Sequence, residues 1–316
     1  MDILIMERIP AVATDWLREN GANPLMPYEG DDWESRTASI VAVIVRAAKV
    51  DVELMDRLPA LRVVGKYGVG FDTIDLVTAA DRGILVTSIP GVNANSVAEL
   101  GVALLASSAR DLVAGDAMVR DGRFTERFES RMKQDLTGSR LGIVGAGRIG
   151  RRVAQICHGG WDCPVGVFDP YFDPATLDFE VAAFDGVTDL FAWADNVVVA
   201  APLTDATRGL VGEAELRALG SEGILVVCSR GNIVDEAALL TALDEGWIFG
   251  AGLDVYAKEP PVGNPLLGQA KTVLSPHMGG HTRKTREAMG MAVCGQVLTL
   301  LNGGEAPLLT SAEPWS

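Results

Sequence analysis

The stretch LGIVGAGRIGRRVAQI, residues 141–156, changes its hydrophobic pattern at a short glycine-rich turn. It begins as a mostly apolar run of the kind found in a buried strand and continues with the spacing of an amphipathic helix. Gly145, Gly147 and Gly150 lie in the turn and at the start of that helix. A strand, a glycine turn and a helix in this order predict one unit of a parallel sheet with crossover helices.

The spacing of the three glycines indicates a ligand. In a G-x-G-x-x-G turn the first glycine allows the tight turn, the second lets a pyrophosphate approach the backbone, and the third lets the helix pack against the strand. The amides of Arg148 and Ile149, at the helix N-terminus, would face the phosphates. We therefore predict that Gly145, Gly147, Arg148, Ile149 and Gly150 bind a dinucleotide.

An acidic residue refines the prediction of the cofactor. The next apolar run, PVGVFD, ends in Asp169, nineteen positions after Gly150. A carboxylate there can accept hydrogen bonds from both hydroxyls of an adenosine ribose, whereas it would repel a 2'-phosphate. The predicted cofactor is therefore NAD and not NADP.

The same alternation of β-rich runs and helical patterns extends along the chain, and it predicts an α/β protein with parallel sheets. A long helix is expected over residues 94–120 and a last helix over residues 285–301. The other strand-like runs before and after the glycine turn are IVAVIVR, LRVVGKYG, GILVTSI, NVVVAAP, GILVVCSR and IFGAGLDVY.

Composition limits the possible partners. The 316 residues, of which 48% are hydrophobic and 22% charged, suffice for two domains with sizeable cores. The 42 acidic and 27 basic residues give a formal charge of -15, which repels phosphate backbones and anionic lipids. We therefore expect a small-molecule partner, with no nucleic acid and no membrane.

The start of the chain and the cysteines favour a cytoplasmic location. MDILIMERIP lacks the basic and apolar regions of a signal peptide, and no apolar run approaches the roughly 20 residues of a membrane span. The four cysteines form no C-x-x-C pair and have no metal-binding spacing with the three histidines. Reduced thiols and no metal site are expected.

Several further segments, in one order along the chain, resemble the D-2-hydroxyacid dehydrogenases, in the branch of phosphoglycerate dehydrogenase and hydroxypyruvate reductase. Together with the glycine turn and Asp169, the resemblance covers nearly the whole chain. The segments are VVGKYGVGFDTIDL (63–76), PGVNANSVAEL (90–100), SRGNIVDEAAL (229–239), GAGLDVYAKEPP (250–261) and SPHMGGHT (275–282).

This resemblance implies two Rossmann-like domains. Residues 1–97 and 283–316 would form a discontinuous substrate domain, with a cofactor domain, residues 98–282, inserted into it. The implied activity is NAD-dependent interconversion of a D-2-hydroxy acid and its 2-oxo acid by hydride transfer. Candidate substrates are 3-phosphoglycerate, hydroxypyruvate, glyoxylate or a similar small acid, possibly with a second anionic group. A homodimer is expected, and no C-terminal regulatory domain is expected beyond Ser316.

The resemblance also assigns three catalytic residues, Arg230, Glu259 and His277. Their chemistry suits the roles, because a guanidinium can bind a carboxylate in a bidentate manner and polarise an adjacent carbonyl. An imidazole can donate or accept the proton that must accompany hydride transfer. A neighbouring carboxylate favours the imidazolium form and orients the ring.

The remaining assignments concern the cofactor and the substrate carboxylate. Asp254 matches the family's contact to the nicotinamide carboxamide, and Pro202 is expected among the cofactor contacts. Glycines in KYGVG expose successive amides that can form an anion-binding nest, and the resemblance implies that this loop holds the substrate carboxylate. The predicted residues of this loop are Tyr67, Gly68 and Val69.

Two cations lie near the predicted nest or at the end of another strand-like run. Lys66 directly precedes Tyr67, and Arg46 ends the run IVAVIVR. They either bind a second anionic group of the substrate or are surface charges. Two other functions also remain open at this stage. One is a phosphite or formate dehydrogenase, although formate dehydrogenases generally have glutamine where this chain has Glu259. The other is an NAD(H)-sensing binding protein similar to the corepressors that share this fold.

Overall fold

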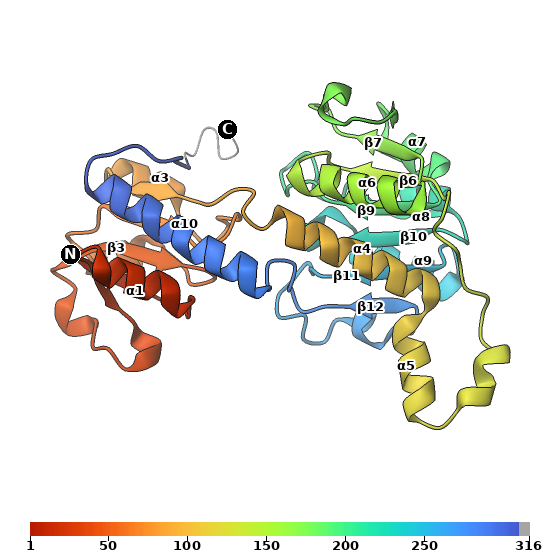
Figure 1. Ribbon diagram of the computed structural model, residues 1–316, viewed down its shortest axis with the longest axis horizontal. Helices are drawn as coiled ribbons and strands as arrows, with labels where there is room; N and C mark the ends of the chain where they lie inside the picture. Colours follow the sequence, from red (N-terminus) through yellow and green to blue (C-terminus); the bar gives the residue numbers. More distant parts are fainter. Residues whose placement is uncertain (310–316) are drawn as a thin grey trace. The chain divides into compact units, whose positions relative to one another are not determined.

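The computed structural model describes residues 1–309 and contains two compact units (Figure 1). Unit 1 comprises Met1–Asn93 together with the described residues from His281 onward, and unit 2 comprises Ala94–Gly280. The expected domain limits after residues 97 and 282 differ from these by a few residues. The expected substrate domain also included residues 310–316, which lie outside the described residues.

Unit 1 is built on a five-stranded parallel sheet with the order β2-β1-β3-β4-β5. The strand order reverses between β1 and β3, so the loops that follow these two strands flank a switch point, where open parallel sheets bind ligands. The strands are β1 (Asp2–Ile5), β2 (Asn23–Leu25), β3 (Ile40–Val45), β4 (Val63–Lys66) and β5 (Leu85–Thr87).

Helices cover both faces of this sheet. Alternate residues of the strands point into two separate apolar clusters, one shared with α1 and α10 and the other with α2 and α3. A Cβ at Gly65 in β4 would lie 2.5 Å from a methyl group of Val297, so glycine allows α10 to pack on the strand. The helices are α1 (Ala11–Glu19), α2 (Val52–Arg57), α3 (Leu76–Asp81) and α10 (Arg283–Leu301), with 3-10 turns at Pro27–Glu29 and Glu34–Arg36.

Unit 2 contains a seven-stranded parallel sheet with the order β12-β11-β10-β9-β6-β7-β8. Its strand order reverses between β6 and β9, which makes the loops after these two strands the expected ligand crevice. The strands are β6 (Leu141–Val144), β7 (Val165–Phe168), β8 (Val181–Ala183), β9 (Asn196–Val199), β10 (Ile224–Val227), β11 (Gly250–Leu253) and β12 (Thr272–Leu274).

The two faces of the second sheet are likewise covered by helices. Helices α4 and α6 pack on one face, and α7, α8 and α9 pack on the other (Figure 1). Among residues 1–309, no helix is long and apolar enough to cross a membrane. The helices are α4 (Ala94–Arg110), α5 (Leu112–Arg120), α6 (Arg148–Trp161), α7 (Val187–Trp193), α8 (Glu213–Leu219) and α9 (Glu236–Glu245), with 3-10 turns at Phe124–Phe128, Pro174–Thr176, Gly231–Ile233 and Pro265–Gly268.

The single helix expected over residues 94–120 is wrong, because the structure divides it into α4 and α5. Asp111 lies between them with a φ of 51°, in the left-handed region. Its carboxylate accepts hydrogen bonds from Arg131 at 2.7 Å and Lys133 at 2.8 Å. Burial opposes ionisation of Asp111, but these two cations hold its pKa below the ordinary value. The break is thus stabilised by residues about twenty positions further along the chain.

Candidate active site

The predicted residues of unit 2 lie along one edge of its sheet. Six neighbouring strands each end in a loop that carries one or more of them. Since adjacent strands are about 4.8 Å apart, the five steps from β12 to β7 span roughly 24 Å. In spatial order the loops carry His277 (after β12), Asp254 and Glu259 (after β11), Arg230 (after β10), Pro202 (after β9), Gly145 (after β6) and Asp169 (after β7).

The glycine loop has the geometry that its spacing predicted. Gly145 has a φ of 90°, and a Cβ on it would lie 2.5 Å from the Cα of Ala201 in the loop after β9. A Cβ on Gly150 would overlap the carbonyl oxygen of Gly145. A Cβ on Gly147 would meet no atom within 4 Å. The first and third glycines are therefore needed for packing, whereas the second leaves open space beside the backbone.

The loop after β7 is tied to the glycine loop by a carboxylate. Asp169 accepts hydrogen bonds from the amide of Ala146 at 2.8 Å and from the amide of Tyr171 at 2.9 Å. Each carboxylate oxygen retains a further acceptor site for a ligand. Helix α6 begins at Arg148, so the amides of Arg148 and Ile149 belong to its first turn, where helix amides point toward bound anions.

Two of the three catalytic candidates form a direct pair. The Nδ1 atom of His277 lies 2.7 Å from Oε2 of Glu259, and the two side chains are 49% and 37% exposed. Burial opposes ionisation of Glu259, but the bond to His277, the amide of Tyr256 and the charge of Arg230 hold its pKa below the ordinary value. With Nδ1 engaged, Nε2 is the ring nitrogen that can exchange a proton with a ligand.

The third candidate, Arg230, lies in the loop after β10, next to the loop after β11 that carries Glu259. Its Nη1 donates to the carbonyl of Ser229 at 2.8 Å, and its charge acts on Glu259. A Cβ on the following residue, Gly231, would overlap the backbone of Tyr256. Glycine at this position therefore lets the loop after β10 pack against the loop that leads to Glu259.

A buried carboxylate shapes the loop that holds His277. Asp254 is 1% exposed, and its two oxygens accept bonds from the hydroxyl of Ser275 at 2.7 Å and the amides of Met278 at 2.7 Å and Gly279 at 2.9 Å. Its carbonyl accepts the amide of His277, whose φ of 54° lies in the left-handed region. Asp254 thus holds the histidine loop, and its expected contact with nicotinamide remains a proposal.

Sequence reasoning missed Gly231 and Ser275. The signal for Gly231 was a glycine directly after an arginine at a strand end, which indicates a close backbone approach. Ser275 bonds to a carboxylate 21 positions earlier, and nothing in the local sequence indicates that contact.

In unit 1, the structure reduces the number of backbone amides that the predicted carboxylate-binding nest can offer to a ligand. The amide of Tyr67 donates to the carbonyl of Val45 at 2.8 Å, and the amide of Gly68 donates to the carbonyl of Lys66 at 2.9 Å. Both amides therefore already have acceptors within the protein, so the prediction rests mainly on Val69. The Tyr67 side chain is buried in the core of unit 1 and does not line a surface.

The two cations suspected of binding a second anionic group differ in their surroundings. Lys66 is 6% exposed, and its Nζ donates to the carbonyl of Arg46 at 2.5 Å and lies 3.4 Å from the hydroxyl of Thr73. The Arg46 side chain is exposed, and its amide donates to Glu7 at 2.8 Å. Sequence reasoning did not single out Glu7.

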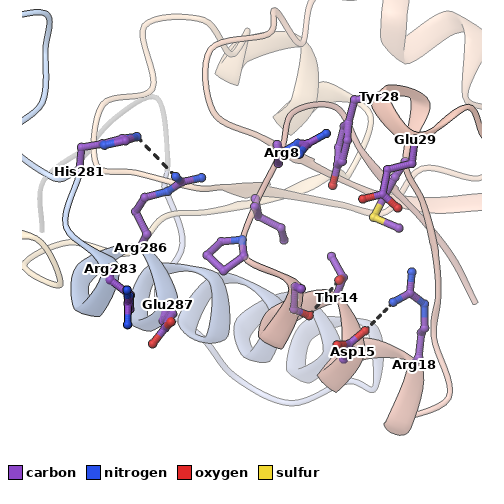
Figure 2. Close-up of a pocket in the computed structure, with 14 residues that line it drawn as sticks. Arg8, Thr14, Asp15, Arg18, Tyr28, Glu29, His281, Arg283, Arg286 and Glu287 are labelled. Carbon is purple, nitrogen blue, oxygen red and sulfur yellow. Dashed lines mark hydrogen bonds and ion pairs between the residues drawn. The ribbon is translucent and has the colours of Figure 1, made fainter.

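Unit 1 also contains an open cavity of about 600 Å³ at the first turns of α1 and α10 (Figure 2). Arg8 lies over the Tyr28 ring, and Arg286 lies 3.4 Å from His281. Arginines and acidic residues line this cavity together, and none of the predicted site residues is among them. Among the described residues, no cluster of three or more His, Cys, Asp or Glu side chains could hold a metal ion.

Comparisons with known proteins identify a family that this chain matches. Residues 102–279 match the family described as D-isomer specific 2-hydroxyacid dehydrogenase, NAD binding domain. A glyoxylate reductase from Thermococcus gammatolerans is 33% identical over 321 residues, which cover 98% of this chain and 96% of that protein. A D-3-phosphoglycerate dehydrogenase from Archaeoglobus fulgidus is 33% identical and covers 99% of this chain, but only 60% of its own length is matched. The structure of an NADPH-dependent glyoxylate/hydroxypyruvate reductase from Sinorhizobium meliloti is 30% identical, with a TM-score of 0.87 over 99% of this chain and 98% of that chain.

Proposed function

The chain belongs to the D-isomer-specific 2-hydroxyacid dehydrogenases, and we propose on this premise that its substrate is a short 2-oxo acid such as glyoxylate or hydroxypyruvate. It is an NAD-dependent oxidoreductase that interconverts a D-2-hydroxy acid and the corresponding 2-oxo acid. The observation that carries the proposed site is the 2.7 Å pair of His277 and Glu259. The relative from Thermococcus gammatolerans is named a glyoxylate reductase, and the similar structure from Sinorhizobium meliloti is named a glyoxylate/hydroxypyruvate reductase. These names support the choice of the two acids.

In the proposed mechanism of reduction, His277 donates the proton from Nε2 to the carbonyl oxygen of the substrate. NADH, when bound, supplies the hydride to C2. Glu259 holds the imidazole ring through Nδ1 and places a carboxylate beside it. In the reverse direction, His277 accepts the proton from the 2-hydroxyl group.

Arg230 has a separate role in this proposal. Its planar guanidinium can bind the substrate carboxylate and also polarise the carbonyl oxygen. The second contact strengthens as negative charge develops on that oxygen in the transition state. In unit 1, the amide of Val69 is proposed as a carboxylate contact.

Asp169 is proposed to set the choice of NADH over NADPH. Its carboxylate is oriented by Ala146 and Tyr171 at the end of β7, and no basic residue follows it directly in the sequence FDPYFD. A 2'-phosphate there would face a like charge. We expect kcat/KM to be at least about tenfold higher with NADH. Equal values for the two cofactors would contradict the role of Asp169.

The experiment that tests the function is a panel of 2-oxo acids with NADH, followed by absorbance at the nicotinamide band. Glyoxylate and hydroxypyruvate should be reduced, and the His277→Gln variant should lose roughly 10²- to 10⁴-fold in kcat while it still binds NADH. Binding of NADH without reduction of any acid would instead favour a nucleotide-sensing protein. Oxidation of phosphite or formate, with no reduction of 2-oxo acids, would favour one of those enzymes.

The assembly and location are also proposals. The segment that comprises α5 and residues 124–132 exposes many apolar side chains, which supports a two-fold homodimer through this segment. Four buried, reduced cysteines support a reducing compartment such as the cytoplasm, and cell fractionation tests this location. The exposed apolar residues of the segment are Leu112, Val113, Val119, Phe124, Phe128 and Met132.

A further inference from the structure

Tyr256 makes one hydrogen bond to each of the two segments that carry the acid–base pair of unit 2. Its amide donates to Oε1 of Glu259 at 3.2 Å, and its hydroxyl donates to the carbonyl oxygen of Ser275 at 3.1 Å. Ser275 lies two residues before His277, whose Nδ1 is 2.7 Å from Oε2 of Glu259. These three bonds, the Tyr256 side chain and the backbone from Ser275 to His277 therefore form a closed ring.

The surroundings of Tyr256 make it a rigid connection. The residue is 7% exposed and belongs to an apolar cluster of unit 2. Its backbone lies directly against Gly231, where no Cβ would fit. A tyrosine side chain has only two rotatable bonds before its hydroxyl, so a packed ring fixes the position of the oxygen. Burial raises the pKa of the phenol, which keeps the hydroxyl a neutral donor at neutral pH.

Other bonds of the loop after β12 hold it to a different part of the neighbouring strand. The Asp254 carboxylate accepts three bonds from this loop, and the amide of Ser275 donates to the carbonyl of Leu253 at 2.8 Å. All of these bonds end at the last residue of β11 or at the residue after it. The Tyr256 hydroxyl instead joins the loop to the segment that continues to Glu259.

We propose that Tyr256 is a positioning residue whose hydroxyl keeps Nδ1 of His277 on Glu259. With Nδ1 held there, the neutral imidazole carries its hydrogen on Nδ1 and leaves Nε2 able to accept the proton of the 2-hydroxyl group. Without the hydroxyl, the segment of His277 can shift and the ring can place its hydrogen on Nε2. That tautomer cannot act as the base. The inference rests on the proposed function, because it concerns the same acid–base pair.

The kinetic test uses Tyr256→Phe, which removes the hydroxyl and keeps the ring in the core. We expect kcat for glyoxylate with NADH to fall about 2- to 10-fold, the effect of one ordinary hydrogen bond. KM for glyoxylate and Kd for NADH should stay near the wild-type values, because the hydroxyl is not proposed to touch either ligand. Tyr28→Phe, which removes a half-buried phenol in unit 1, is the matched control and should keep the wild-type kcat.

A second background separates positioning from a general effect on the fold of unit 2. In Glu259→Ala the imidazole has no carboxylate to align with, so the addition of Tyr256→Phe should lower kcat no further. A residue that acted only through the stability of unit 2 would cause the same loss in both backgrounds. An equal loss of kcat with and without Glu259 would therefore overturn the positioning role.

Nitrogen NMR of isotopically labelled imidazoles tests the inference without turnover. The chain has three histidines, and the signals lost in His277→Gln identify His277. At a pH where this ring is neutral, the wild type should show hydrogen on Nδ1, and Tyr256→Phe should increase the fraction with hydrogen on Nε2. If the wild type reduces no 2-oxo acid but this difference is found, the proposed function fails and the positioning role stands. Equal tautomer fractions in the two proteins, or a wild type with hydrogen on Nε2, would overturn the inference alone.

Discussion

Individual residues at the candidate site are held in position by different physical constraints. His277 has a left-handed backbone, a conformation that costs about 1–3 kcal/mol for a residue other than glycine. The bond from its amide to the carbonyl of Asp254 and the three bonds accepted by the Asp254 carboxylate hold the loop in this conformation. Glu259 then fixes the ring. The orientation of the imidazole therefore depends on two separate carboxylates.

The role of Arg230 can be tested with a substitution that keeps its charge. Arg230→Lys should lower kcat and raise KM, because an ammonium cannot bind the carboxylate and the carbonyl oxygen with one planar group. Steady-state kinetics with glyoxylate and NADH measure both constants. Arg217→Lys, on the exposed surface of α8, is the control. If Arg230→Lys keeps the wild-type kcat and KM, Arg230 is not part of the site.

The pair of Glu259 and His277 predicts a shift in the pH profile. Because the pKa of Glu259 is lowered, this side chain is a carboxylate at neutral pH and stabilises a protonated imidazole. Glu259→Gln removes that charge, so the pH at which reduction falls to half its maximum should move downward. The pH dependence of kcat in the reduction direction measures the shift. An unchanged midpoint would contradict the pairing, and Glu213→Gln on the surface of α8 should behave as the wild type.

Among the structural elements, the turn between β6 and α6 gives the clearest contrast between folding and binding. Gly145→Ala should lower the melting temperature, because the residue has a φ of 90° and its Cβ would press on the backbone of Ala201. Gly147→Ala should leave the melting temperature within a few degrees of the wild type, because its Cβ enters open space.

Substitution of the same two glycines should affect NADH binding in the opposite order, with the larger effect at Gly147. A Cβ on Gly147 would occupy the space proposed for the pyrophosphate, so we expect at least about a tenfold rise in Kd for NADH. Fluorescence titration measures Kd, and calorimetry measures the melting temperature. Gly159→Ala, in the last turn of α6 with no atom within 4 Å of its Cβ, is the control. A Gly147→Ala variant that binds NADH normally would remove the loop from the cofactor site.

The elements that were predicted correctly are those whose pattern is local. The fold class and the family are confirmed, and the strand-like runs of the sequence correspond to strands such as β3, β9 and β10. Strands β2 and β8 were not recognised, because each has only three residues. The break at Asp111 was missed because a helical pattern on both sides concealed a turn stabilised by Arg131 and Lys133.

At the candidate site, the same distinction between local patterns and contacts of distant residues applies. A motif of six residues indicated the glycine loop, whereas Glu7 and the amides after β3 are 39 to 41 positions apart. Their contact depends on the pairing of β1 with β3, which no local pattern encodes. Lys66 likewise looked like a surface or ligand-binding cation, and only the structure shows its buried ammonium on a backbone carbonyl.

For the whole molecule, the apolar surface of α5 and residues 124–132 predicts assembly. Phe128 and Met132 are 80% and 87% exposed, values that are unfavourable for a monomer in water. Sedimentation equilibrium should give about twice the 33.4 kDa mass of one chain. Phe128→Asp with Met132→Asp should shift the protein to the monomer. Val77→Asp, on the exposed surface of α3, should leave the mass unchanged.

The division of unit 1 between the two ends of the chain also determines when each unit can fold during synthesis. Val293 and Val297 of α10 pack on β4 at Gly65, so one face of the first sheet is covered by α1 alone until residues 283–301 leave the ribosome. Unit 2 is a continuous segment, and Ser96 at its start bonds to the carbonyl of Gly279 at its end at 2.6 Å. Because domains fold as units when their residues become available, unit 2 can complete its fold before unit 1, although translation of unit 1 begins first. The apolar part of this face that α10 covers stays exposed throughout that interval, when chaperones can bind it.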